Sequence, residues 1–178
     1  METPMMANNG APKNKGSLIG LIFHEISHSY FPFYMGTNER KYGWMDEGCA
    51  TFFPGVVVDS LVPGYDYYRD LIRGYEYFAG TELELPMMIP TFGLPSQSSG
   101  TASYSRPGTA YMELQKLLGN DLFKKVLEMG HRHKEYNNSL SMMKEILENY
   151  LSQVPVSHRE RVRYLLRELE AIPEVRQP

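Results

Sequence analysis

The pentad His24-Glu25-Ile26-Ser27-His28 constrains this chain more than any other feature of its sequence. Residues four apart on a helix share a face, with Cβ atoms roughly 5 to 6 Å apart, so two imidazoles there can reach one zinc ion. The carboxylate of Glu25 lies one step round the helix, about 100° away, where it can face a water beside the metal. The pentad therefore requires a helix, and it predicts His24 and His28 as zinc ligands.

The surrounding residues favour that helix. Ser17 fits an N-cap, and apolar residues follow at positions 18, 19, 21, 22 and 26. We expect a helix that is buried on most of its circumference and ends at Pro32. With five His and 16 Glu in 178 residues, chance would produce such a pentad only about 0.01 times in a chain of this composition.

A catalytic zinc site keeps three protein ligands and one open position, so a third ligand is needed. Glu47 is the leading candidate, because it follows His28 after 18 intervening residues and lies on the next predicted helix. Glu39 lies in a polar loop and is less suitable. Asp46 has a shorter reach, and an N-cap or a supporting contact to a ligand is the better interpretation of it.

The rest of the chain has a mainly helical pattern. Further helices are predicted over about 44–53, resuming at 58–61 after a Pro-Gly pair, and then over 66–79, 104–118, 121–134, 139–152 and 157–171. Strand signals are confined to the first few residues and, as an alternative, to 84–92. The long Pro-rich and Ser-rich connection over about 80–103 is expected to border a cleft.

Composition excludes several classes of function. A chain of 178 residues with 42% hydrophobic residues can bury a sizeable core and fits one domain, with or without a tail. Its 18 Lys and Arg against 21 Asp and Glu argue against nucleic acid as a partner. No apolar run is long enough to span a membrane, and the lone Cys49 cannot form an internal disulfide.

The spacing and context of the motifs resemble those of one enzyme family. HEISH, 18 residues and then Glu47 within Trp44-Met45-Asp46-Glu47-Gly48 is similar to the aminopeptidase N family of zinc metallopeptidases. That family has H-E-x-x-H, 18 residues and E in a W-L-N-E-G-like context. The resemblance implies the helical portion of a thermolysin-like zincin catalytic domain with one Zn²⁺ per chain. Thermolysin-type endopeptidases share the pentad but differ in the spacing to the third ligand.

Two more positions extend the resemblance. The family's G-x-M-E-N motif, whose Glu binds the substrate's amino group, is similar to Met1-Glu2-Thr3, with Glu2 placed 22 positions before His24. Thr3 stands where the family usually has Asn. The family's catalytic Tyr, in a Y-x-K-G-like context, corresponds to Tyr104, 57 positions after Glu47. Pro107 departs from that context, which leaves Tyr111 as the alternative.

The resemblance implies a reaction and a role for each residue. Zinc would lower the pKa of its water and polarise the scissile carbonyl of a peptide. Glu25 would act as general base, Tyr104 would donate to the developing oxyanion, and Glu2 would hold the free amino group, so that N-terminal residues are removed. Two alternatives stay open: a catalytically silent zinc-binding module, and a thermolysin-like endopeptidase.

The resemblance also sets expectations about the extent of the domain. Residues 1–155 would form part of a catalytic domain, and residues 156–178 a charged helix or tail. The family's sheet-bearing half and a preceding all-β domain would lie before Met1 and could contact this part. The absence of a leader sequence then leaves the compartment unknown.

Overall fold

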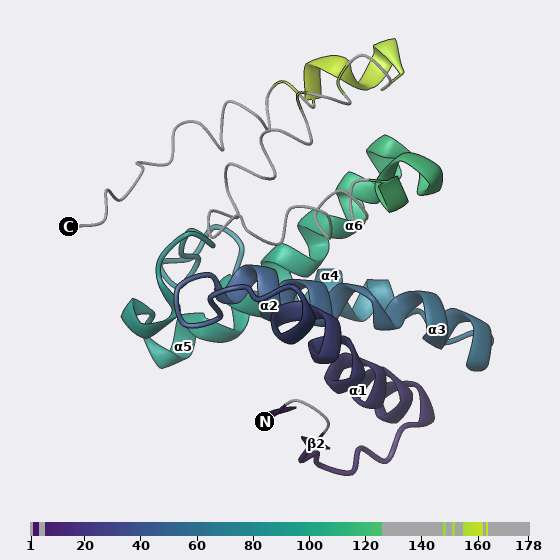
Figure 1. The fold of residues 1–178 in the computed structure, drawn as a ribbon, viewed down its shortest axis with the longest axis vertical. Coiled ribbons are helices and arrows are strands. Elements are labelled where there is room, and N and C mark those ends of the chain that lie inside the picture. The colour runs from purple at the N-terminus through teal and green to yellow at the C-terminus, as the bar shows by residue number, and fades with distance from the viewer. Residues whose placement is uncertain are drawn as a thin grey trace. The chain divides into compact units, whose positions relative to one another are not determined.

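The computed structural model describes residues 2–3, 6–125, 148, 151, 155–161 and 163. Within them the protein is mainly helical, as predicted. The chain forms two compact units, residues 1–112 and residues 113–178, and the metal-site motifs all belong to the first. Figure 1 shows the order of the elements along the chain, from the N-terminal strands through α1 to α6.

Among the described residues, strand structure is limited to the N-terminus. Strand β1 (Glu2–Thr3) pairs antiparallel with β2 (Met6–Ala7), with Glu2 opposite Ala7 and Thr3 opposite Met6. The stretch 84–92, for which a strand was the alternative, contains turns and the start of a short 3-10 helix instead. Its Pro86 and Pro90 lack the backbone N–H that a strand ladder needs.

Helix α1 (Lys15–His28) carries the pentad, as predicted, but its start differs from the expectation. Its N-cap is Asn14, whose side-chain oxygen accepts a hydrogen bond from the backbone N–H of Ser17 at 3.0 Å. Ser17 was therefore wrongly assigned as the N-cap. It lies in the first turn, where its backbone N–H needs the acceptor that Asn14 supplies.

The burial of α1 also differs from the expectation. Ile22 is 42% exposed and Ile26 is 54% exposed, so the helix is not buried on most of its circumference. Gly16 and Gly20 are buried on another side, against Tyr65 and Tyr67. Glycine lets these tyrosine rings approach the helix backbone, and that close approach determines which side of α1 faces the core.

The end of α1 follows from Pro32. The regular helix ends at His28 and continues as an irregular π-helical segment, η1 (Ser29–Tyr34), in which Phe31 has an extended backbone with φ −116° and ψ 119°. A residue before proline is driven out of the helical region by the proline ring. The bend also buries Phe31, which is 4% exposed.

The helices predicted over 44–53, 66–79 and 104–118 are present as α2 (Gly43–Phe52), α4 (Tyr67–Glu76) and α6 (Arg106–Leu118). Helix α3 (Pro54–Leu61) already begins at Pro54, earlier than the predicted 58. The connection predicted over about 80–103 contains three short helical segments, η2 (Thr91–Gly93), α5 (Ser96–Ser99) and the π-helical η3 (Gly100–Ser105). Asp66 caps α4 by accepting from the backbone N–H of Arg69 at 2.9 Å. Pro107 is the second residue of α6, which η3 joins without a break.

Helix α2 lies at the centre of the first unit and packs against α1 and η3. Gly48 allows this helix a close approach to α6, because a Cβ at that position would lie 2.6 Å from Cβ of Pro107. Aromatic and aliphatic side chains surround the contact. The buried apolar residues of the first unit are Phe31, Met35, Trp44, Met45, Cys49, Ala50, Phe52, Val58, Leu71, Ala102, Tyr111 and Met112.

The second unit is described only in part. The end of α6 and the helical residues 120–125 bury Leu114, Leu117, Leu118, Leu122 and Phe123. Residues 156–161 are also helical and overlap the start of the helix predicted over 157–171. Most of the residues in the helices predicted over 121–134, 139–152 and 157–171 lie outside the described part of the chain.

Candidate metal centre

Helix α1 brings the two imidazoles of the pentad together. His24 and His28 are one helical turn apart, and their Nε2 atoms lie 3.1 Å from each other. The two rings meet edge to face, with an interplanar angle of 86°. Both histidines therefore direct the same ring nitrogen to one point on the surface of α1.

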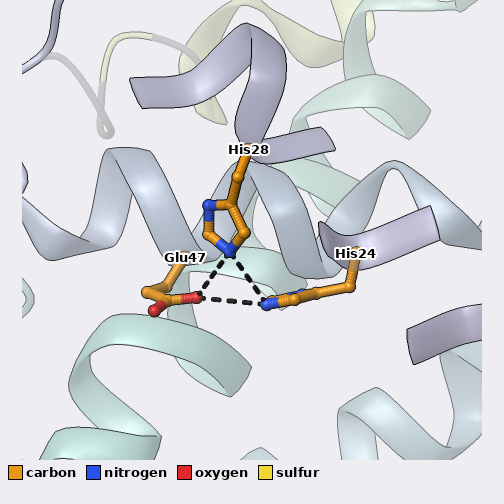
Figure 2. Close-up of side chains that lie close together, drawn as sticks. All are labelled: His24, His28 and Glu47. Atoms are coloured by element: carbon orange, nitrogen blue, oxygen red, sulfur yellow. Dashed lines mark hydrogen bonds and ion pairs between the residues drawn. The ribbon is translucent and has the colours of Figure 1, made fainter. Parts of the chain in front are cut away.

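Helix α2 adds a carboxylate at that point. Oε2 of Glu47 lies 3.2 Å from Nε2 of His24 and 3.4 Å from Nε2 of His28 (Figure 2). This oxygen is buried and has no hydrogen-bond partner among the described residues. Three ligand atoms about 2.0 to 2.1 Å from one tetrahedral zinc ion would be about 3.3 Å from one another. The three side chains fit such an ion and could hold a metal.

Asp46, the residue before Glu47, supports the second imidazole. Its Oδ1 lies 2.7 Å from Nδ1 of His28, and both side chains are buried. The backbone oxygen of Phe31, in the bend after α1, lies 3.2 Å from the same Nδ1. Two acceptors at Nδ1 keep a proton on that nitrogen, so Nε2 is the ring nitrogen that can bind a metal ion once it has released its own proton.

The same contacts determine the charges at the centre. Burial disfavours a charged His28, but hydrogen bonds to Asp46 and Glu47 outweigh it and raise the pKa of His28 to about 10. Burial raises the pKa of Asp46 to about 6, against the opposing effect of His28. Burial would also raise the pKa of Glu47, yet its contacts with His24, His28 and Tyr104 lower that pKa to about 2. Glu47 is therefore a carboxylate at neutral pH, the form that binds a cation.

Tyr104, the third element of the centre, comes from η3. Its hydroxyl donates to Oε1 of Glu47 at 2.6 Å, and its ring stacks on His24 with an interplanar angle of 11°. Tyr104 is 38% exposed, so its ring also faces solvent. The alternative residue, Tyr111, is buried in the core between Trp44 and Phe52.

Glu25 follows His24 on α1. Its side chain is half-buried, and Oε2 is buried without a hydrogen-bond partner among the described residues. On a helix it shares a face with the exposed Ile22, three residues earlier. A carboxylate with an unpaired oxygen can accept a proton.

Glu2 belongs to strand β1, whose backbone packs near α1. Its side chain lies outside the described part of the structure. Its predicted contact with a substrate amino group stays a prediction.

A supporting contact from Asp46 to a ligand was one of the two predictions for that residue, and the structure identifies His28 as the ligand. Two other contacts of the centre were not foreseen from the sequence. They are the contact of the Phe31 carbonyl with Nδ1 of His28 and the hydrogen bond from Tyr104 to Glu47. For the Phe31 carbonyl, the only indication in the sequence was Pro32, which predicts a bend in the chain at this point.

A search of the described residues for a membrane-crossing segment finds no helix with the necessary length and apolar character.

Comparison with known proteins finds one informative relative. The chain is 26% identical to an aminopeptidase N from Plutella xylostella over an alignment of 114 residues, which covers 61% of this chain and 12% of that protein. The similarity confirms the resemblance to the aminopeptidase N family that the motifs indicate. The chain spans about an eighth of the relative's length. No family model matches the chain, and no solved structure matches it.

Proposed function

We propose that this chain carries the zinc centre of a metallopeptidase that removes N-terminal residues from peptides. The observation that supports this function best is the convergence of Nε2 of His24, Nε2 of His28 and Oε2 of Glu47 within 3.1 to 3.4 Å of one another. The similarity to an aminopeptidase N supports the choice of reaction.

In this proposal the three side chains hold one Zn²⁺ ion. Bound zinc lowers the pKa of a coordinated water toward neutrality and polarises a carbonyl group. Asp46 holds the ring of His28, so that its Nε2 keeps facing the site. Tyr104 does the same for the carboxylate of Glu47.

Glu25 has the role of general base. Its unpaired Oε2 takes the proton of the attacking water and passes it to the nitrogen of the leaving amine. A base of this kind contributes typically 10²- to 10⁴-fold to the rate. The hydroxyl of Tyr104 is the donor for the developing oxyanion, and Glu2 pairs with the ammonium group of the substrate.

Two measurements on the purified chain test the proposal. Metal analysis should find one zinc ion per chain, and an aminoacyl-arylamide should be hydrolysed. Zinc without hydrolysis would identify the chain as a silent metal-binding module, an alternative consistent with its covering only 12% of the relative. No bound zinc after incubation with the metal would refute the proposal.

A substrate with a blocked amino group separates two kinds of peptidase. An aminopeptidase needs the free ammonium group and should not cleave the blocked peptide. A thermolysin-like endopeptidase should cleave the blocked peptide at the same rate as the free one. This result would overturn the proposal of an aminopeptidase in favour of an endopeptidase.

A further inference from the structure

The two oxygens of Glu47 have different partners. Oε2 faces the two imidazoles at 3.2 and 3.4 Å, whereas Oε1 accepts the hydrogen bond of Tyr104 at 2.6 Å. The side chain of Glu47 is largely buried, with a relative exposure of 17%. A carboxylate with one oxygen engaged in so short a hydrogen bond cannot rotate freely to present both oxygens to the same point.

The position of Tyr104 makes this contact durable. Its ring stacks on His24, and its backbone belongs to η3, which packs closely on α2. On either side of it in the chain, Ser103 is 3% exposed and Arg106 donates to the backbone oxygen of Leu85 at 2.9 Å. The hydroxyl is thus held over Glu47 by contacts on both flanks.

We infer that Tyr104 is a positioning residue for Glu47, which it restricts to offering a single oxygen, Oε2, to the ion. This inference rests on the proposed zinc centre and adds a role for Tyr104 before the reaction, since its one hydroxyl proton serves either Glu47 or the developing oxyanion at a given moment. A carboxylate that binds through both oxygens fills one more coordination position, and a catalytic zinc site needs that position open. The hydrogen bond therefore keeps the centre able to take a water or a substrate.

The test compares Tyr104→Phe with Tyr75→Phe. Phenylalanine at position 104 keeps the ring that stacks on His24 and removes only the hydroxyl. Tyr75 is a matched control, because its hydroxyl donates at 2.8 Å to another carboxylate, Glu84, away from the three ligands. Circular dichroism checks that both variants keep the helical content of the wild type.

Two readouts apply, and neither needs catalytic activity. The first is zinc affinity, measured by competition with a chelating dye. We expect Tyr104→Phe to weaken it by about tenfold or more, as losses of outer hydrogen bonds to metal ligands do. Tyr75→Phe should bind like the wild type.

The second readout is the visible spectrum of the cobalt(II)-loaded chain. Four-coordinate cobalt absorbs more strongly than five-coordinate cobalt, so geometry is read from intensity. We expect Tyr104→Phe to lower the molar absorptivity, because Glu47 is then free to bind through both oxygens. A merely structural role would not change the coordination number.

The results separate this inference from the proposed function. A wild-type chain that binds neither ion refutes the zinc centre itself. A wild-type chain that binds both, with a Tyr104→Phe variant equal to it in affinity or in cobalt spectrum, overturns only the role of Tyr104. An equal loss of affinity in both variants would also overturn it, since the effect would not belong to the contact with Glu47.

Discussion

Oδ1 of Asp46 lies 2.7 Å from Nδ1 of His28, on the opposite side of the ring from the nitrogen that faces His24 and Glu47. Because Asp46 immediately precedes Glu47 on α2, two consecutive residues provide a predicted metal ligand, Glu47, and the hydrogen-bond partner of another predicted ligand, His28. The orientation of His28 is thereby tied to the position of α2.

Replacement of Asp46 should reduce metal affinity. Asp46→Ala removes the acceptor at Nδ1, and we expect zinc to bind about 10- to 100-fold more weakly. Asp46→Asn keeps an acceptor oxygen and loses the charge, so its zinc affinity should lie between those of the wild type and Asp46→Ala. Competition with a chelating dye measures this series, and an alanine variant with wild-type affinity would show that Asp46 does not orient the ligand.

Replacement of Glu25 should separate binding from catalysis. Glu25→Gln keeps the size of the side chain but removes the group that accepts a proton. We expect one zinc per chain to be retained while hydrolysis of an aminoacyl-arylamide falls by at least about 10²-fold. Hydrolysis at the wild-type rate would show that another group is the base.

Replacement of Glu47 should have the opposite effect. Glu47→Ala removes the only carboxylate of the predicted ligand set, so we expect zinc to be lost on dialysis along with any activity. Metal analysis after dialysis measures the outcome. Retention of a full equivalent of zinc would remove Glu47 from the ligand set.

Metal removal should destabilise the first unit. An ion that binds only the folded chain contributes about 2.7 kcal/mol when its free concentration is 100 times Kd. We therefore expect the thermal midpoint to fall on addition of a chelator and to recover when zinc is restored in excess. A midpoint that is independent of zinc would argue against a folded-state site.

Gly48 should be intolerant of a side chain. In Gly48→Ala the new Cβ would lie 2.6 Å from Cβ of Pro107, so α2 and α6 must separate. We expect a loss of about 1 to 3 kcal/mol in the free energy of unfolding, typical of overpacking. Urea unfolding measures it.

Gly100 provides the control for that substitution. It has helical dihedral angles, with φ −60° and ψ −39°, and nothing lies within 4 Å of a Cβ built there. Gly100→Ala should therefore be neutral or stabilising, by up to about 1 kcal/mol. Equal losses in both variants would contradict the role of Gly48 in the contact between α2 and α6.

Much of the first unit could be predicted from local patterns. The pentad on a helix, the break between α2 and α3 near Pro54 and the helix predicted over 66–79 all depend on residues close in sequence. Backbone propensity and side-chain capping act over a few residues, so these features are readable without a fold. The prediction of Ser17 as the N-cap was wrong because Asn14, three residues earlier, accepts the hydrogen bond of a backbone N–H at this helix end.

The burial of side chains was less predictable. Ile22 and Ile26 are apolar yet exposed, because glycines on another side of α1 admit Tyr65 and Tyr67 and so decide which face is covered. Tyr111 was the alternative to Tyr104 as the catalytic tyrosine, but its side chain is buried in the core. Burial depends on which distant elements meet, and a periodic pattern alone does not contain that information.

For the metal centre, the sequence by itself determined the candidate ligands His24, His28 and Glu47, because their spacing follows from helix geometry and from a resemblance in motif. Only the tertiary structure decided that Asp46 turns to His28 and that Tyr104, 57 positions from Glu47, donates to its Oε1. Hydrogen bonds of this kind are short-ranged and directional. They depend on the packing of α1, α2 and η3, to which residues far apart in the chain contribute together.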